Sequence, residues 1–531
     1  KLHGDPGGGA VMSGLPSMVH GDGIKKSVQV KFKGYDHNLG AEEGSLWDME
    51  NLSGDSAPVL APRKPRYLLR TLEKPNGLYA GESLCWADGG SFYVDGEQKG
   101  AVEDSRKQFC ALGDYLILLP DKAYYNKRTG EFGSLEAQWS GGVRFEDGVF
   151  AGESAKGNSI VSIGEAFPFS VNEAVTISGC GEERNNKTAV IREVSEDGKT
   201  LRFYENSFQV WSGEAALKRE VPDMDFLCEN ENRLWGCKGS TIYASYLGNP
   251  FIWNNFDTVS TACFAADVGS AGDFTGCCSY LGYPVFFKED QIYKVYGSKP
   301  SNFQVMGSAS LGVEKGSGRS LAVAGERLFY LSRSGVVSYT GGVPQVISQA
   351  LGQQRFRNAV GGSDGTKYYV SLEDSLGASH LFAFDTRIGQ WYREDGVRAL
   401  EFGWGGELYL LASDGGLWLA GDPRSIPEGA VQETLQSAAE FGDFIEGSPG
   451  KKGLSKLLLR AELEAGASLR VLVRYDGGPW RQAGQLKAEK KRSFLLPLIP
   501  RRCDHYRIRL EGTGGWRLFS LTREFYLGTE L

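Results

Sequence analysis

The chain has 531 residues, which is too long for one ordinary hydrophobic core and predicts a large repeat domain with smaller modules. Its 72 glycines, 28 Phe and 23 Tyr are typical of aromatic strands joined by tight turns. With 58 basic and 66 acidic side chains the net charge is −8, which argues against a surface built to grip nucleic-acid phosphates.

No apolar run approaches the roughly 18 residues that a membrane helix needs, and the first residues lack the blocks of a signal peptide. We therefore expect a soluble protein made in the cytosol, with no stable membrane insertion and no sequence-specific DNA binding.

The chain begins with a segment that can bury little apolar surface. Residues 1–26 contain Gly4, Pro6 and the run Gly7 to Gly9, and they predict a flexible arm that orders only on assembly. Residues 27–137 are expected to hold an N-terminal strand and the first propeller blades, after a turn-rich stretch that ends near Arg66.

A hairpin pattern then recurs along the chain. Each copy has a turn, an aromatic or aliphatic strand, a second turn and another such strand, and the copies start at Tyr79, Ala111, Glu229, Ser279, Val323, Gly362 and Phe402. The later copies recur about every 40 residues and alternate by two, which favours the blades of a β-propeller over helical repeats. The prediction is an all-β fold with a six- or seven-bladed propeller, seven being favoured.

Two stretches interrupt the repeat. Residues 138–221 carry short strands around turns such as Asp197–Gly198, and they predict a small β-barrel or sandwich inserted between two blades. Residues 222–434 are expected to hold the remaining blades. After a Gly-, Pro- and Glu-rich break, residues 435–531 alternate over about six strands and predict a C-terminal β-sandwich.

The sequence contains few residues in patterns that are typical of catalytic sites. No phosphate-binding loop, zincin, serine hydrolase or EF-hand motif is present, and we expect no catalytic, cofactor-binding or metal-ligating residue. The five histidines are widely separated. Paired carboxylates occur in turns, where they are solvated. Trp391 and Trp404 are candidates for contacting a glycan, although aromatic residues at alternating positions more often fill the wedge between blades.

The nine cysteines form neither a disulfide framework nor a zinc-knuckle pattern. They are Cys85, Cys110, Cys180, Cys228, Cys237, Cys263, Cys277, Cys278 and Cys503. Small buried thiols on strands are expected, and alternation should turn neighbouring Cys277 and Cys278 to opposite faces of one strand.

The stretch from Asn232 to Phe256 resembles a pattern found in the propellers of bacteriophage tail nozzles and head-completion hubs. The matching residues are Ile242, Tyr243, Ser245, Gly248, Asn249, Pro250, Phe251 and Trp253. Residues 32–66, the strand pair from Tyr283 to Gly297 and the terminal sandwich resemble modules of similar virion proteins. The motif is architectural rather than catalytic. If Phe251 is buried, its truncation to Ala should cost about 3 to 5 kcal/mol.

The resemblance implies a structural protein of the virion tail, assembled in the host cytoplasm into a ring, commonly of six subunits. Its partners would be adaptor or portal-side proteins and the tail fibres or needle, and DNA would pass only in transit. Two alternatives stay open: a receptor- or carbohydrate-binding tail-tip protein, and a propeller hydrolase or lyase acting on polysaccharide.

Overall fold

The computed structural model describes residues 23–150, 153–256, 259–448, 450–487 and 490–527. The chain is built from strands and divides into two compact units. The propeller unit comprises Tyr35–Asn38 and Arg63–Thr434, and the sandwich unit comprises the described residues within 23–34, 39–62 and 435–527. Short 3-10 turns interrupt the strands at η1 (Gly54–Ser56), η2 (Glu183–Asn185), η3 (Pro300–Asn302), η4 (Gly318–Ser320) and η5 (Gln349–Leu351).

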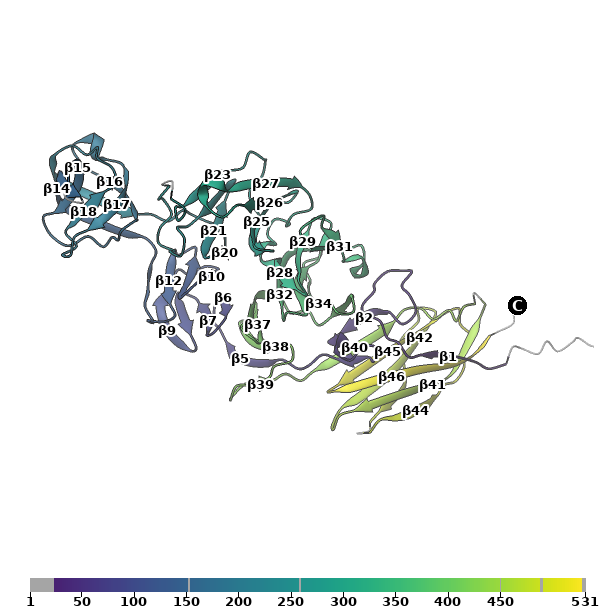
Figure 1. The fold of residues 1–531 in the computed structure, drawn as a ribbon. Helices are drawn as coiled ribbons and strands as arrows, with labels where there is room; N and C mark the ends of the chain where they lie inside the picture. Colours follow the sequence, from purple (N-terminus) through teal and green to yellow (C-terminus); the bar gives the residue numbers. More distant parts are fainter. Residues whose placement is uncertain (1–22, 151–152, 257–258, 449, 488–489, 528–531) are drawn as a thin grey trace, which may run out of the picture. The chain divides into compact units, whose positions relative to one another are not determined.

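Seven antiparallel sheets follow one another among the described residues of the propeller unit (Figure 1). The first three sheets contain β6 (Pro75–Ala80), β7 (Leu84–Asp88), β8 (Ser91–Val94) and β9 (Glu97–Ala101); β10 (Gln108–Leu112), β11 (Tyr115–Leu119), β12 (Ala123–Asn126) and β13 (Phe132–Ser134); and β20 (Phe226–Asn230), β21 (Arg233–Lys238), β22 (Thr241–Ala244) and β23 (Phe264–Asp267).

The next three sheets have the same four-strand order. They contain β24 (Gly276–Tyr280), β25 (Tyr283–Phe287), β26 (Gln291–Tyr296) and β27 (Gln304–Ala309); β28 (Ala322–Ala324), β29 (Arg327–Ser332), β30 (Gly335–Tyr339) and β31 (Gln345–Val346); and β32 (Arg357–Ser363), β33 (Lys367–Glu373), β34 (Ser379–Asp385) and β35 (Gln390–Arg393). Each of the seven hairpins expected from the sequence lies in a different sheet, so the repeat is confirmed.

The seventh sheet combines both ends of the propeller unit. It contains β36 (Ala399–Trp404), β37 (Leu408–Ala412), β38 (Gly416–Ala420), β5 (Tyr67–Thr71) and β39 (Val431–Gln432). Strand β5 precedes the first sheet in the chain but pairs with β38, where Leu68 lies opposite Trp418. The last sheet is therefore completed by the strand that leads into the first.

Local turn chemistry explains the hairpins. Strands β8 and β9 are joined by Asp95 and Gly96, whose φ angles are 48° and 96°. Positive φ at both central residues is the type I′ turn, which Asp-Gly favours and whose twist matches that of the flanking strands.

Hydrophobic clusters join each sheet to its neighbour. Phe92 of the first sheet packs on Tyr125 of the second, with ring centroids 5.8 Å apart. Trp86 of the first sheet shares a buried cluster with Leu417 of the seventh, and β36 lies against β6. Neighbouring sheets therefore pack on one another, and the first sheet also packs on the seventh, an arrangement typical of a β-propeller.

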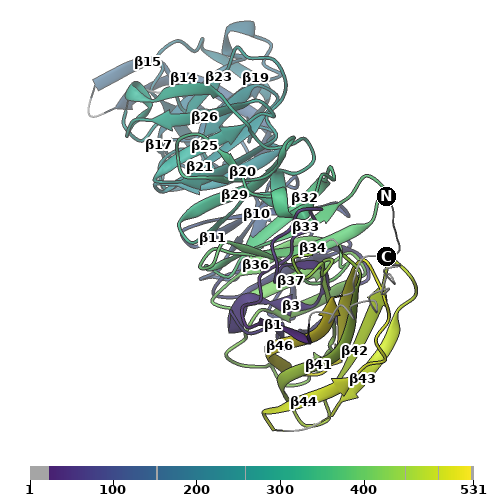
Figure 2. The ribbon, with the colours of Figure 1, turned by 90° about the vertical axis from the view of Figure 1, so that its right-hand side faces the viewer.

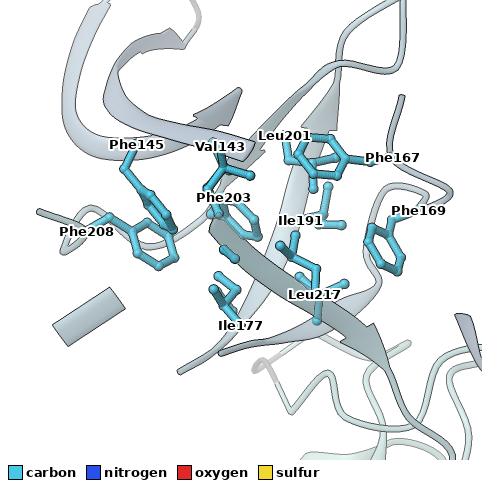
Figure 3. Close-up of a cluster of buried hydrophobic side chains, with 14 of the residues drawn as sticks. Val143, Phe145, Phe167, Phe169, Ile177, Ile191, Leu201, Phe203, Phe208 and Leu217 are labelled. Carbon is cyan, nitrogen blue, oxygen red and sulfur yellow. The ribbon is translucent and has the colours of Figure 1, made fainter. Parts of the chain in front are cut away.

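The insertion between the second and third sheets is a closed six-stranded barrel. Its strands are β14 (Ala137–Phe150), β15 (Glu153–Ser162), β16 (Ala174–Ser178), β17 (Thr188–Val194), β18 (Thr200–Phe203) and β19 (Trp211–Arg219). Figure 3 shows inward side chains from several strands, including Val143, Ile191 and Leu217, meeting in a core with Phe145 and Phe203. Because β14 and β19 pair antiparallel, the barrel leaves the propeller and returns to it at adjacent points. The inserted barrel is confirmed.

The sandwich unit has two larger sheets, and Figure 2 labels strands of both. One contains β1 (Lys25–Gln29), β46 (Trp516–Leu527), β41 (Lys452–Leu463) and β44 (Arg492–Pro497), and the other contains β2 (Leu46–Glu50), β40 (Gln436–Phe441), β45 (Tyr506–Thr513), β42 (Ser468–Tyr475) and β43 (Arg481–Leu486). A short pair, β3 (Leu52–Ser53) and β4 (Ala61–Pro62), also belongs to this unit. Trp516 Nε1 donates to Ser437 Oγ at 2.9 Å and ties one sheet to the other.

The sandwich differs from the boundaries expected from sequence. Strands β1 and β2 complete it, whereas the sequence predicts an N-terminal strand and the first propeller blades over residues 27–137. Strand β1 also begins at Lys25, inside the expected arm of residues 1–26, while residues 1–22 lie outside the described residues. The sequence does not predict these pairings, because strands that pair across most of the chain, such as β1 with β46, leave no local sequence pattern.

Candidate functional site

A pocket of about 350 Å³ lies where the first strands of five propeller sheets approach one another. Its walls come from β6, β10, β28, β32 and β36, and from the η4 turn. The wall is partly aromatic, with Tyr79, Phe109, Phe402 and Trp404, and partly charged, with Arg319 and Glu401. The volume falls in the range of small-molecule sites. We call this the axial pocket.

The charged side of the axial pocket is held by a fixed set of contacts. Arg319 Nη1 donates to Glu401 Oε2, and its Nη2 donates to the Lys107 carbonyl at 2.7 Å. Arg106 Nη2 lies 3.5 Å from the same Glu401 oxygen and donates to the Leu400 carbonyl at 2.6 Å. Two guanidinium groups therefore share one carboxylate oxygen.

Burial and neighbouring charges shift the pKa values of Arg106 and Glu401. Burial lowers the pKa of Arg106 to about 10, and the charges of Arg319 and Arg398 add to that shift while Glu401 opposes it. Burial also raises the pKa of Glu401, against the opposing charges of Arg319 and Arg106. Arg106 Nε is buried and has no hydrogen-bond partner among the described residues. The cluster thus has two cations, Arg106 and Arg319, and one carboxylate, Glu401, in a partly buried site.

The two tryptophans proposed as glycan contacts have different surroundings. Trp404 lines the axial pocket and is 48% exposed, so one face can meet a ligand. Trp391 is only 2% exposed, and its Nε1 donates to the Ile347 carbonyl at 2.8 Å. It packs on Phe384 inside the blade and offers no face to a sugar, contrary to the expectation.

The axial pocket offers a ligand an aromatic face on Trp404, hydrogen-bond donors on Arg319 and a hydrogen-bond acceptor on Glu401. Glu401 is the one carboxylate among the described residues that line it. Across the described ranges, no group of three His, Cys, Asp or Glu side chains could hold a metal ion. Sequence reasoning missed Arg319 and Glu401, because they are 82 residues apart and no motif surrounds either.

The resemblance motif forms a compact turn after β22. Gly248 has a φ of 70°, which favours glycine, and Asn249 Oδ1 accepts from the Phe251 amide at 2.8 Å. Trp253 Nε1 donates to the Pro250 carbonyl at 2.8 Å. These contacts fix the turn internally.

The motif's remaining residues differ in depth. Ile242 is fully buried on β22, whereas Tyr243 and Phe251 are half-buried. Both half-buried rings pack against the core that joins the second and third sheets.

Phe251 also connects this turn to the barrel. Its ring meets Tyr115 and Tyr124 of the second sheet edge to face, with centroids 5.4 and 5.0 Å away. The guanidinium of Arg219, at the end of β19, lies 5.1 Å from the same ring centroid. Three elements therefore meet at this one side chain, and we call the contact the Phe251 joint.

Within the described ranges, no helix is long and apolar enough to cross a membrane.

Several solved structures resemble this chain at low sequence identity. No protein-family model matches the chain, and no curated protein matches it. Raptor of Chaetomium thermophilum is 12% identical with a TM-score of 0.32, and the match covers 68% of this chain and 29% of Raptor. The β-propeller domain of the Trilobed protease from Pyrococcus furiosus is 11% identical with a TM-score of 0.28, covering 70% of this chain and 98% of that domain.

The endosialidase of phage phi92 is 9% identical with a TM-score of 0.23, covering 72% of this chain and 70% of that one.

Proposed function

We propose that this chain is a non-catalytic structural protein of a phage virion tail, which assembles into a ring that extends or seals the DNA channel. In this proposal the seven sheets are seven blades, closed by β5. The ring has six copies and meets adaptor or portal-side proteins on one side and tail fibres or a needle on the other. DNA passes in transit only, and assembly takes place in the host cytoplasm.

The Phe251 joint carries the proposal. The residues that resemble the tail nozzle motif make a turn that is fixed by its own hydrogen bonds and packs on a neighbouring blade and the end of β19. A side chain used in this way sets geometry rather than chemistry. A scaffold protein that must present an inserted module to its neighbours needs such a joint.

Electron microscopy of the purified full chain tests the proposal. We expect closed rings of six subunits, and labelling of particles with an antibody against this chain should mark the tail. Mass photometry gives an independent count of subunits. Monomers at micromolar concentration together with no label on the tail would overturn the proposal.

A second candidate is a carbohydrate-binding tail-tip protein, and the exposed face of Trp404 in the axial pocket favours it. Binding on a glycan array that is lost in Trp404→Ala would support it. A polysaccharide hydrolase needs two carboxyl groups facing each other across a cleft, and Glu401 alone does not supply that pair in the axial pocket.

A further inference from the structure

The axial pocket has the two features that recognise a charged sugar. One wall offers aromatic rings, of which Trp404 has about half its surface exposed. A positive charge comes from Arg319, which lines the same pocket and contacts Glu401. Pyranose rings stack their C–H faces on aromatic rings, and guanidinium groups bind carboxylates through paired N–H donors.

The charge balance decides between a neutral and an acidic ligand. Arg319 and Arg106 both lie against the carboxylate of Glu401, and of these two cations Arg319 lines the pocket itself. Two guanidinium groups against one carboxylate leave a net positive charge beside the pocket, and this charge favours an anionic ligand over a neutral one.

We propose that the axial pocket binds a carboxylate-bearing sugar, such as a uronic acid unit of an acidic polysaccharide. The sugar ring stacks on Trp404, and its carboxylate faces Arg319 in competition with Glu401. This inference goes beyond the structural role and does not depend on it. If the chain forms rings but binds no sugar, the sugar-binding proposal is wrong and the structural role stands. If it binds sugar as a monomer, the structural role is wrong and the sugar-binding proposal stands.

Isothermal titration of the full chain tests the proposal with two matched probes, methyl β-D-glucuronide and methyl β-D-glucoside. They differ only in a carboxylate against a hydroxymethyl group at one carbon. We expect the glucuronide to bind about tenfold more tightly or better, and to weaken as salt rises. Equal affinity for both sugars, or no binding by the glucuronide, would overturn the proposal.

Inorganic phosphate is the third probe and separates a sugar site from a general anion site. Phosphate should compete weakly, because it has no ring to stack on Trp404. If phosphate binds as tightly as the glucuronide, the pocket recognises charge alone and the sugar assignment is wrong.

Variants locate the binding. Trp404→Ala should weaken glucuronide binding about tenfold, because an exposed aromatic face is lost while the blade core stays intact. Trp480→Ala is the matched control, since Trp480 also lies beside an arginine, Arg474, but in the sandwich unit. Unchanged binding in Trp404→Ala, or an equal loss in both variants, would contradict the assignment.

Glu401→Gln gives a result that a purely structural role would not. Removing the internal carboxylate frees Arg319 for the ligand, so glucuronide binding should tighten about threefold or more while glucoside binding stays the same. Weaker glucuronide binding in a variant with wild-type circular dichroism would show that Glu401 does not compete, and the proposed carboxylate position would be wrong.

Discussion

Phe251 meets Tyr124 edge to face, with ring centroids 5.0 Å apart and ring planes at 82°. This is the favoured geometry of an aromatic pair, because the positive edge of one ring faces the negative face of the other. The contact joins the turn after β22 to the second sheet of the propeller.

Phe251→Ala should therefore destabilise the propeller. The ring is half-buried rather than fully buried, so we expect a loss of about 2 to 3 kcal/mol, below the 3 to 5 typical of a core Phe. Urea unfolding followed by fluorescence measures it. Phe256→Ala, in the same loop but 57% exposed, is the control and should change stability by about 0.5 kcal/mol or less.

A variant Phe251→Ala with unchanged unfolding but lost assembly would identify the ring as an interface residue instead. The Phe251 joint would then be a contact between subunits rather than within one.

Strand β5 closes the cycle of sheets in our proposal, so breaking it should loosen both ends of the propeller. Leu68→Pro removes a donor from a strand that pairs on both sides, and we expect a loss of about 3 kcal/mol or more. Limited proteolysis should then cut in the first and seventh sheets before the others. Proline at Val431, on the short outer strand β39, should cost about 1 kcal/mol or less. Equal behaviour of the two variants would contradict closure by β5.

An ion-pair cluster beside β5 predicts a pH dependence. Arg66 Nη1 lies 2.7 Å from Asp395 Oδ2, and Arg66 Nη2 lies 2.6 Å from Glu394 Oε2. Burial alone would raise the pKa of Asp395, but the charges of Arg66 and Arg63 and the Val397 amide together hold that pKa below its usual value.

A carboxyl whose pKa is lowered by folding stabilises the folded state above its unfolded pKa, about 3.9, and this stability is lost as pH falls toward the folded pKa. Thermal unfolding between pH 7 and 3 should show the loss. Asp395→Asn should remove that part of the pH dependence and cost about 3 kcal/mol at pH 7, because Arg66 is left with one partner fewer in a buried site.

Asp225→Asn is the control for this measurement, since Asp225 is an exposed carboxylate in the same unit. It should leave both the stability at pH 7 and the acid limb unchanged. An identical acid limb in wild type and Asp395→Asn would show that the cluster does not contribute.

The blades could be predicted from sequence because their signals are local. Asp95 and Gly96 mark a turn between adjacent strands, and alternation marks the strands themselves. The completion of the sandwich by β1 could not be predicted in this way. Ser27 lies beside Arg523, which is 496 residues further along the chain, and nothing near Ser27 names that partner.

The residues of the axial pocket could not be predicted from local sequence either. Alternation placed Trp391 and Trp404 on strands, but both faces of a propeller blade are covered by neighbouring blades, so alternation does not say which ring is exposed. The pairing of Arg319 with Glu401 depends on blades that are two apart in the chain. The two residues meet where the first strands of these sheets approach one another.

The oxidation state of the nine cysteines tests the cellular compartment and the class of protein together. Alternation does turn neighbouring Cys277 and Cys278 to opposite faces, because Cys277 packs in the core between the third and fourth sheets and Cys278 in the core between the fourth and fifth. All nine thiols are free in the structure. Burial raises the pKa of Cys85 to about 12 and that of Cys277 well above its usual value, so few thiolates form at neutral pH.

Native protein should therefore react slowly with iodoacetamide, and protein denatured without reductant should take up nine labels, because the thiolate is the reactive form and burial limits access. Intact-mass spectrometry counts the labels in both states. A protein assembled in a reducing cytosol has no use for disulfides, whereas a secreted enzyme or adhesin of this size is expected to pair most of its cysteines. Two or more stoichiometric disulfides in the denatured, unreduced sample would exclude cytosolic assembly and with it the proposed virion role.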